Sequence, residues 1–329
     1  MMNWKKWKKA FAAATLVVSM GLVAGCGADK AQDSKAAYNI GVVQLVEHGA
    51  LDAANKGFVD GLASKGYKDN VKFDQQNAQA DQSNLANIAQ RFVNNKVDLI
   101  CAIATPAAQS VANVTKDIPI VATAVTDYEE AKLIESNAKP NTNVTGTTDM
   151  NPIKEQIDLM LRLVPNTKTI GTVYCSSEVN SQKQIDIMKA YAQSKGIKVV
   201  EATVSTVNDI QQATQSIVGE VDAIYIPTDN ILASAMPTLI AITDAAKVPV
   251  ICGEANMVKA GGLATLGVDY YKLGFQTGEM AADILAGKSK PATMAIQSLK
   301  EMTLTINAEN AKKLGIEIPA DLKAQAGIK

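Results

Sequence analysis

The feature that most constrains the fold is a series of short apolar segments that occurs twice along the chain. In the first half, the expected strands are 38–44, 71–74, 97–103 and 118–122. In the second half, they are 169–174, 198–202, 221–226 and 248–251. Helical patterns lie between them, and short buried strands alternating with helices are typical of parallel sheets covered on both faces. The sequence therefore predicts two similar doubly wound α/β lobes.

The tail has too few elements for a third domain. Residues 261–269 are expected to be extended, 270–286 helical and 294–306 extended again. We expect the tail to complete both lobes, so that the chain crosses between them several times and forms a hinge. The expected lobes are 38–147 plus 265–293 and 148–264 plus 294–329. Because ligands bind outside the carboxyl ends of strands in such sheets, the lobes would share one ligand cleft.

The N-terminus has the pattern of a lipoprotein signal peptide. Residues 1–10 carry four lysines and no acid, and the apolar stretch 11–24 is too short for a comfortable membrane span. The stretch ends in Leu22-Val23-Ala24-Gly25-Cys26, which resembles the bacterial lipobox, where the Cys thiol takes a lipid. We expect residues 1–25 to be a signal peptide, Cys26 to be lipidated and 26–37 to be a flexible tether. The protein would be anchored to the cell membrane, facing the periplasm or the cell exterior. An ordinary signal peptide with a coincidental Cys is the alternative.

Composition argues against several function classes. The formal net charge is -1 and there are only two arginines, so neither a nucleic-acid footprint nor arginine phosphate clamps are expected. One histidine makes a His-rich metal site or most His-dependent catalytic arrays hard to build, and four scattered cysteines are too few for a disulfide scaffold. We expect a monomer with no metal, no cofactor and no enzymatic activity.

Polar residues follow most of the expected strands, at the cleft end of each lobe. The candidate ligand-binding residues are Gln44, Glu47, Thr105, Pro106, Ala107, Thr126, Asp127, Ser176, Ser177, Asn180, Thr228, Asp229, Asn230, Asp269 and Tyr270. The helix start at 105–108 suits a ligand carboxylate, with help from Thr126. Asp229 is the preferred partner of a ligand ammonium, and Asp269 and Glu47 are alternatives. The competing interpretation is that such residues are helix N-caps.

A ring-contact candidate and an acid–base candidate lie near the same cleft. Tyr270, or an apolar side chain near Gln44 and Leu45, is a candidate contact for a ligand ring. Glu47 and His48 are adjacent and suggest an acid–base pair, but no nucleophile or metal-ligand set accompanies them. We therefore interpret His48 as structural.

Several motifs resemble one family. Residues 44–52, Gln-Leu-Val-Glu-His-Gly-Ala-Leu-Asp, resemble the Q-x-V-E-H-P-A-L-D stretch of tryptophan/tyrosine-type substrate-binding lipoproteins, with Gly49 in place of Pro. Further similar segments are 104–109, 124–127, 143–149, 176–181, 227–230 and 263–274. The lipobox, the two repeated lobes and the crossing tail resemble type I periplasmic binding proteins of ABC transporters. The resemblance covers essentially the whole mature chain.

The resemblance implies a solute receptor. It would capture a small amphoteric molecule, an aromatic amino acid (Trp, Tyr or Phe), by hinge closure and deliver it to a membrane permease driven by an ATPase on other chains. The sequence does not rank the three amino acids. The alternative function is a surface-anchored ligand sensor or adhesin that uses the same lobes.

Overall fold

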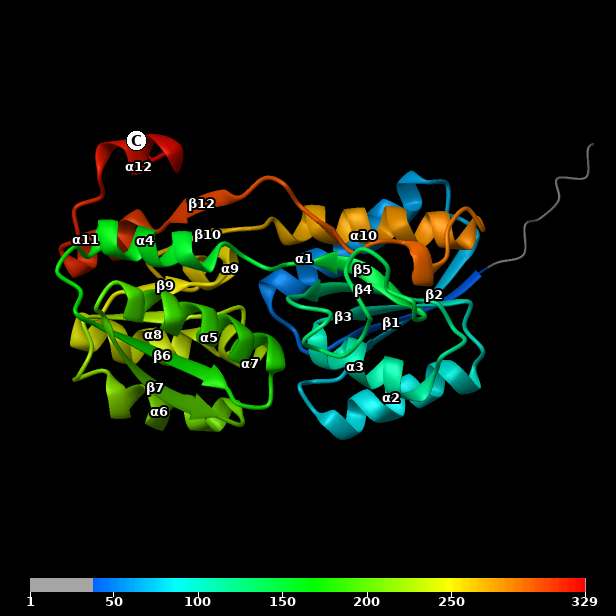
Figure 1. Cartoon of the computed structure of the whole chain (residues 1–329), viewed down its shortest axis with the longest axis horizontal. Coiled ribbons are helices and arrows are strands. Elements are labelled where there is room, and N and C mark those ends of the chain that lie inside the picture. The colour runs from blue at the N-terminus through cyan, green and yellow to red at the C-terminus, as the bar shows by residue number, and fades with distance from the viewer. Residues whose placement is uncertain (1–37, 329) are drawn as a thin grey trace, which may run out of the picture. The chain divides into compact units, whose positions relative to one another are not determined.

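The computed structural model describes residues 38–328, which form two α/β lobes (Figure 1). The signal peptide, the lipidation at Cys26 and the tether 26–37 lie outside the described residues. Among the helices of residues 38–328, none combines the length and the apolar character needed to span a bilayer.

The first lobe is built on a sheet of order β2-β1-β3-β4-β5-β11, in which every described pair is parallel. Its strands are β1 (Tyr38–Gln44), β2 (Val71–Asn77), β3 (Leu99–Ile103), β4 (Ile120–Val125), β5 (Val144–Thr148) and β11 (Gln297–Ser298). Its helices are α1 (Gly49–Ser64), α2 (Gln82–Asn94), α3 (Thr105–Val114) and α10 (Tyr270–Leu285), with the 3-10 turn η2 (Pro291–Thr293). β3 and β4 are buried along their whole length, as expected for central strands covered on both faces.

The second lobe repeats this order in the sheet β7-β6-β8-β9-β10-β12, except that β12 is antiparallel to β10. Its strands are β6 (Thr169–Cys175), β7 (Lys198–Val204), β8 (Ala223–Ile226), β9 (Val250–Cys252), β10 (Ala264–Gly267) and β12 (Thr303–Ile306). Its helices are α4 (Ile153–Leu163), α5 (Val179–Ser194), α6 (Ile210–Ile217), α7 (Asn230–Ser234), α8 (Met236–Ala246), α9 (Ala255–Lys259), α11 (Ala308–Leu314) and α12 (Ala320–Gln325), with the 3-10 turn η1 (Val207–Asp209). The predicted pair of doubly wound lobes is confirmed.

The chain passes between the lobes three times. α4 follows β5 of the first lobe but packs in the second lobe, where Ile157 and Met160 join its core. α10 follows β10 of the second lobe but packs on α1 of the first lobe, where Leu273 joins that core (Figure 1). The third passage runs from β11 to β12.

The expected lobe boundaries need correction at two of these passages. Residues 265–267, expected in the first lobe, belong to β10 of the second sheet. Residues 294–298, expected in the second lobe, lie beside the first, because Met294 accepts a hydrogen bond from Thr145 and β11 pairs with β5. An extended pattern shows that a segment needs backbone partners, but it does not say which sheet edge supplies them.

α1 and α10 approach so closely that their facing positions must lack side chains. A Cβ added to Gly274 would lie 1.9 Å from the carbonyl oxygen of Ala54, and one added to Gly61 would lie 2.1 Å from that of Phe275. Gly57 and Gly278 are equally close to the opposite backbone. Four glycines therefore fix the position of α10, and with it the second passage of the chain, against the first lobe.

Candidate functional site

A small cavity lies where the two lobes meet. Its lining residues come from both lobes and from the passages between them: His48, Ala50, Leu51, Ala124, Asp149, Thr228, Asp229, Asn230, Ala233, Glu254, Met257 and Tyr270. The space left among these side chains is about 10 Å³, which is room for about one water molecule. A larger molecule therefore enters only when the lobes move apart.

Three carboxyl groups line this cavity, and no lysine or arginine is among its described lining residues. Asp149, Asp229 and Glu254 are all buried. Burial raises the pKa of each of these carboxyl groups above its ordinary value, although hydrogen bonds to each carboxylate oppose the rise. Buried anions without a neighbouring cation are costly, so the cavity favours a positively charged group.

Asp149 lies just after β5, at the first passage between the lobes. Its carboxylate accepts a hydrogen bond from the Thr126 hydroxyl at 2.9 Å and another from the Tyr270 hydroxyl. Thr126 was expected to help hold a ligand carboxylate. Its single hydroxyl proton is directed at Asp149 instead, so in this structure Thr126 positions an acid and does not offer a free donor.

Asp229 braces three elements of the second lobe. One carboxylate oxygen caps α7 by accepting from the backbone N–H of Leu232 at 2.9 Å. The other accepts from the backbone N–H of Cys175 and from the Ser181 hydroxyl, both at 2.7 Å. The side chain is 1% exposed. Asp229 was expected to be the partner of a ligand ammonium, but these contacts already occupy its carboxylate.

A chain of polar contacts connects Glu178 to the first lobe. The Glu178 carboxylate accepts from the side-chain amides of Asn180 at 2.9 Å and of Asn230 at 2.6 Å. The oxygen of Asn230 then lies 3.2 Å from Nε2 of His48 in the first lobe. Burial, and next the neighbouring Asp229, raises the pKa of Glu178 to about 8. Burial lowers the pKa of His48.

The start of α3 is strained and carries an unpartnered hydroxyl. Ala104, directly before the helix, has φ 87° and ψ 152°, a conformation that a residue with a Cβ rarely adopts. Thr105 is 1% exposed, and its hydroxyl has no hydrogen-bond partner among the described residues. Ala124, at the end of β4, also has a positive φ of 55° and lines the cavity. Strain of this kind clusters at functional sites.

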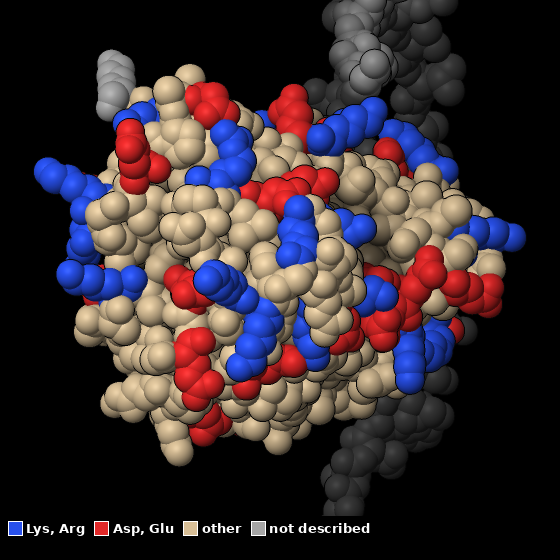
Figure 2. Space-filling view, turned by 60° about the vertical axis from the view of Figure 1, so that its left-hand side comes forward, with Lys and Arg blue, Asp and Glu red and all other residues tan. Residues whose placement is uncertain are grey.

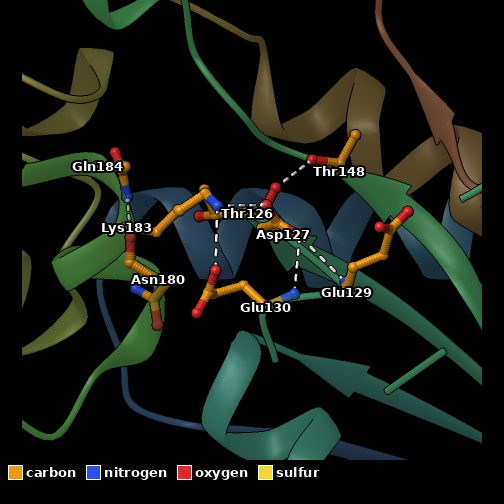
Figure 3. Close-up of polar contacts among 8 residues, drawn as sticks. All are labelled: Thr126, Asp127, Glu129, Glu130, Thr148, Asn180, Lys183 and Gln184. Carbon is orange, nitrogen blue, oxygen red and sulfur yellow. Dashed lines mark hydrogen bonds and ion pairs between the residues drawn. The ribbon is translucent and has the colours of Figure 1, made fainter. Parts of the chain in front are cut away.

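An ion-pair cluster joins the lobes at the rim. Lys183 of α5 lies 3.1 Å from a carboxylate oxygen of Glu130 and 3.6 Å from one of Asp127, both in the segment after β4. Figure 3 shows the lysine extending from the second lobe toward these two acids. Asp127, a candidate ligand residue, also accepts from the backbone N–H groups of Glu129 and Glu130. Asp127 thus lies at the edge of the interface between the lobes and does not line the cavity.

Comparisons with known proteins agree with this architecture. Residues 39–328 match the family described as ABC transporter substrate binding protein. The chain belongs to this family. A tyrosine-binding protein of Clostridioides difficile (strain R20291) is 43% identical over 96% of this chain and 94% of its own length. The ABC domain from Streptococcus pneumonia in complex with L-Trp is 41% identical, covers 89% of this chain and 99% of its own, and superposes with a TM-score of 0.86. A ligand-free, open substrate-binding protein with adhesive properties from Clostridium difficile is 44% identical over 86% of this chain and 97% of its own, with a TM-score of 0.67.

This substrate-binding protein, extracytoplasmic like its family, brings some of the sequence candidates together and leaves others apart. Thr228, Asp229, Asn230 and Tyr270 line the interlobe cavity, and Asn180 adjoins it through its bond to the Thr228 carbonyl. Pro106 and Ser177 line a separate open groove of about 1100 Å³ along α3. The remaining candidates line neither space. Gln44 is buried in contact with Asp52 and Asn55, Ala107 is buried in α3, Glu47 and Ser176 are exposed, and the exposed Asp269 caps α10. Thr105 is buried at the start of α3, Thr126 contacts Asp149, and Asp127 contacts Lys183.

Three polar lining residues were missed as candidates. His48 and Asp149 fall within segments that carry the family resemblance, but His48 was interpreted as structural because no nucleophile or metal-ligand set accompanies it. Glu254 follows β9 in the same way that Asp229 follows β8, so the rule of polar residues after strands could have identified it.

The outer surface of the substrate-binding protein differs from the cavity in its charge pattern. On the face drawn in Figure 2, basic and acidic side chains are interspersed over a mostly uncharged surface. Mixed charges of this kind are typical of a solvated surface. The acidic lining of the cavity therefore differs from the mixed charges of this face.

Proposed function

We propose that this protein binds an aromatic amino acid between its lobes and delivers it to a membrane permease. The observation that carries the proposal is the group of three buried carboxyl groups around a cavity whose described lining has no lysine or arginine. The ammonium of an amino acid supplies the missing positive charge. Support also comes from the relatives, since one at 43% identity is named for tyrosine and one at 41% is a complex with L-Trp.

The ends of the ligand would be held by groups with spare hydrogen-bonding capacity. The Thr105 hydroxyl and the N–H groups at the start of α3 are suited to the carboxylate, because a helix N-terminus favours negative charge. The side-chain oxygen of Asn180 is buried and unpartnered among the described residues, which makes it an acceptor for the ammonium. In this arrangement the ligand ammonium is attracted by the negative electrostatic potential of three carboxyl groups, those of Asp149, Asp229 and Glu254.

The proposed mechanism is hinge closure over the ligand. The chain superposes better on the L-Trp complex, at a TM-score of 0.86, than on the ligand-free open protein, at 0.67, although the identities are nearly equal. Contacts from His48 and Lys183 across the cleft also favour the closed arrangement. Closure would bury the ligand and present a defined surface to the permease.

We further propose that the protein is a monomer anchored to the membrane by a lipid on Cys26. The lysine-rich start, the short apolar run and the small residues before Cys26 support this. Substituting Cys26→Ser and fractionating cells tests the anchor. A substituted protein that stays in the membrane fraction contradicts it.

Calorimetry tests the ligand assignment. We expect L-tryptophan or L-tyrosine to release or take up heat at a single site. Two truncated ligands serve as controls: tryptamine lacks the carboxylate, and indole-3-propionic acid lacks the ammonium. Both should bind far more weakly, because each leaves one buried group of the site unpaired. Full binding of indole-3-propionic acid, or binding of a neutral sugar in place of the amino acids, contradicts the charge argument.

An adhesin function remains the second candidate, because one solved relative at 44% identity is described as having adhesive properties. Adhesion and ligand binding can both be measured on one protein. Cell-adhesion assays with and without saturating tryptophan separate them.

A further inference from the structure

His48 is the only histidine of the chain, and one of its two ring nitrogens is unused. Nε2 lies 3.2 Å from Oδ1 of Asn230 across the lobe interface. Nδ1 is buried and has no hydrogen-bond partner among the described residues. A buried polar atom without a partner destabilises the fold, so native proteins rarely leave one unpaired.

The protonation of the ring follows from the orientation of Asn230. The Glu178 carboxylate accepts from the backbone N–H groups of Asn230 and Ile231, so it faces donors on that side. The side-chain nitrogen of Asn230 donates to the same carboxylate at 2.6 Å. The side-chain oxygen of Asn230 therefore faces His48. Because this oxygen can only accept a hydrogen bond, Nε2 of His48 must carry the proton and donate it. In a neutral ring this leaves Nδ1 as a bare lone pair.

The ring is neutral because burial lowers the pKa of His48, and burial outweighs the opposing effects of Asn230 and Asp52. No described lysine or arginine lines the cavity that His48 borders. The free lone pair of Nδ1 thus requires a hydrogen-bond donor that the described side chains do not supply.

The place of His48 in the cavity indicates which part of a ligand would meet it. His48 precedes Ala50 and Leu51, which line the cavity from the first lobe, while Ala233 and Met257 line it from the second. Together with Ala124 these are the aliphatic members of the lining, where an aromatic ring would lie. The carboxyl groups and the side-chain oxygen of Asn180 attract the ammonium of the ligand.

We propose that Nδ1 of His48 accepts a hydrogen bond from the ring donor of the ligand, so that the site selects aromatic amino acids with an indole N–H or phenol O–H over phenylalanine. This inference rests on the proposed function and adds the reason for its selectivity. A site with a buried acceptor discriminates strongly against analogues that lack the donor, because the acceptor is then left unpaired.

A thermodynamic cycle on ligand and protein tests the proposal. The ligands are L-tryptophan and β-(3-benzothienyl)-L-alanine, in which sulfur replaces the ring N–H with little change in shape. We expect the wild type to bind tryptophan about tenfold more tightly or better. In His48→Phe this preference should disappear, even though both ligands bind more weakly because the contact to Asn230 is lost. Equal binding of the two ligands to the wild type overturns the proposal.

A nitrogen NMR measurement keeps the test independent of the variant. Because the chain has one histidine, ¹⁵N-histidine labelling produces the two ring signals of His48 alone. Tryptophan should shift the unprotonated Nδ1 signal in the direction of hydrogen-bond acceptance, and the benzothienyl analogue should not. A shift with both ligands means that the donor is the ammonium, and no shift with either means that a water serves Nδ1; both results refute the proposal. Failure of every aromatic amino acid to bind refutes the proposed function itself.

Discussion

The contacts of Asp229 lead to a sharp prediction for Asp229→Ala. The substitution leaves the backbone N–H groups of Cys175 and Leu232 and the hydroxyl of Ser181 without their acceptor, all in a region that is buried. Each abandoned buried donor costs about 1–3 kcal/mol, so the three lost contacts together should lower the free energy of unfolding by about 3–9 kcal/mol. Burial raises the pKa of Asp229, so part of this loss is offset by removing a carboxyl group that is costly to bury.

Asp269 provides a matched control. It is also the N-cap of a helix, but it is exposed and accepts from one backbone N–H, that of Lys272 at 3.1 Å. Asp269→Ala should cost about 1 kcal/mol. Urea unfolding measures both variants, and calorimetry with tryptophan is run on the same samples.

The two accounts of Asp229 differ in these results. If Asp229 braces the fold, its variant unfolds at a much lower urea concentration than Asp269→Ala, and the affinity of the protein that remains folded changes less than the stability does. If Asp229→Ala unfolds at the same urea concentration as Asp269→Ala but loses tryptophan binding, the Asp229 carboxylate contacts the ligand and the structural argument is refuted.

Three further substitutions probe the hinge and the cavity. Lys183→Ala should weaken ligand binding by up to about fivefold through faster dissociation, and the effect should be smaller at high salt. Lys189→Ala breaks an ion pair of similar exposure inside the second lobe and should leave ligand binding unchanged. Equal dissociation rates of the two variants in stopped-flow measurements contradict a role for Lys183 in closure. Gly274→Ala places a methyl group against the α1 backbone and should cost about 1–3 kcal/mol in urea unfolding, while Gly219→Ala, with nothing within 4 Å, should stay within about 0.5 kcal/mol. Burial lowers the pKa of His48, so below about pH 6.5 the unfolded chain binds a proton that the folded chain does not. The stability of the wild type relative to His48→Phe should therefore fall as the pH drops through that range, and a constant difference would show that folding leaves the pKa of His48 unchanged.

The alternation of apolar segments was enough to determine the two lobes. The expected strand at 38–44 and helix at 270–286 are found as β1 and α10 with almost the same bounds. Periodicity is a local property that survives because each element buries one face or both. The same pattern could not place residues 265–267 or 297–298, since pairing along a sheet edge depends on which neighbour the fold brings there.

At the site, the sequence determined where polar groups gather, because the carboxyl ends of parallel strands meet at one edge. Only the tertiary structure decided which of those groups are already occupied. Thr126 and Asp229 are engaged by Asp149, Cys175, Ser181 and Leu232. In contrast, the Thr105 hydroxyl, the side-chain oxygen of Asn180 and one ring nitrogen of His48 have no partner among the described residues. The donors and acceptors of a side chain are occupied by neighbours that are distant in the chain. The type of a residue and its position after a strand therefore do not show whether it is free to bind a ligand.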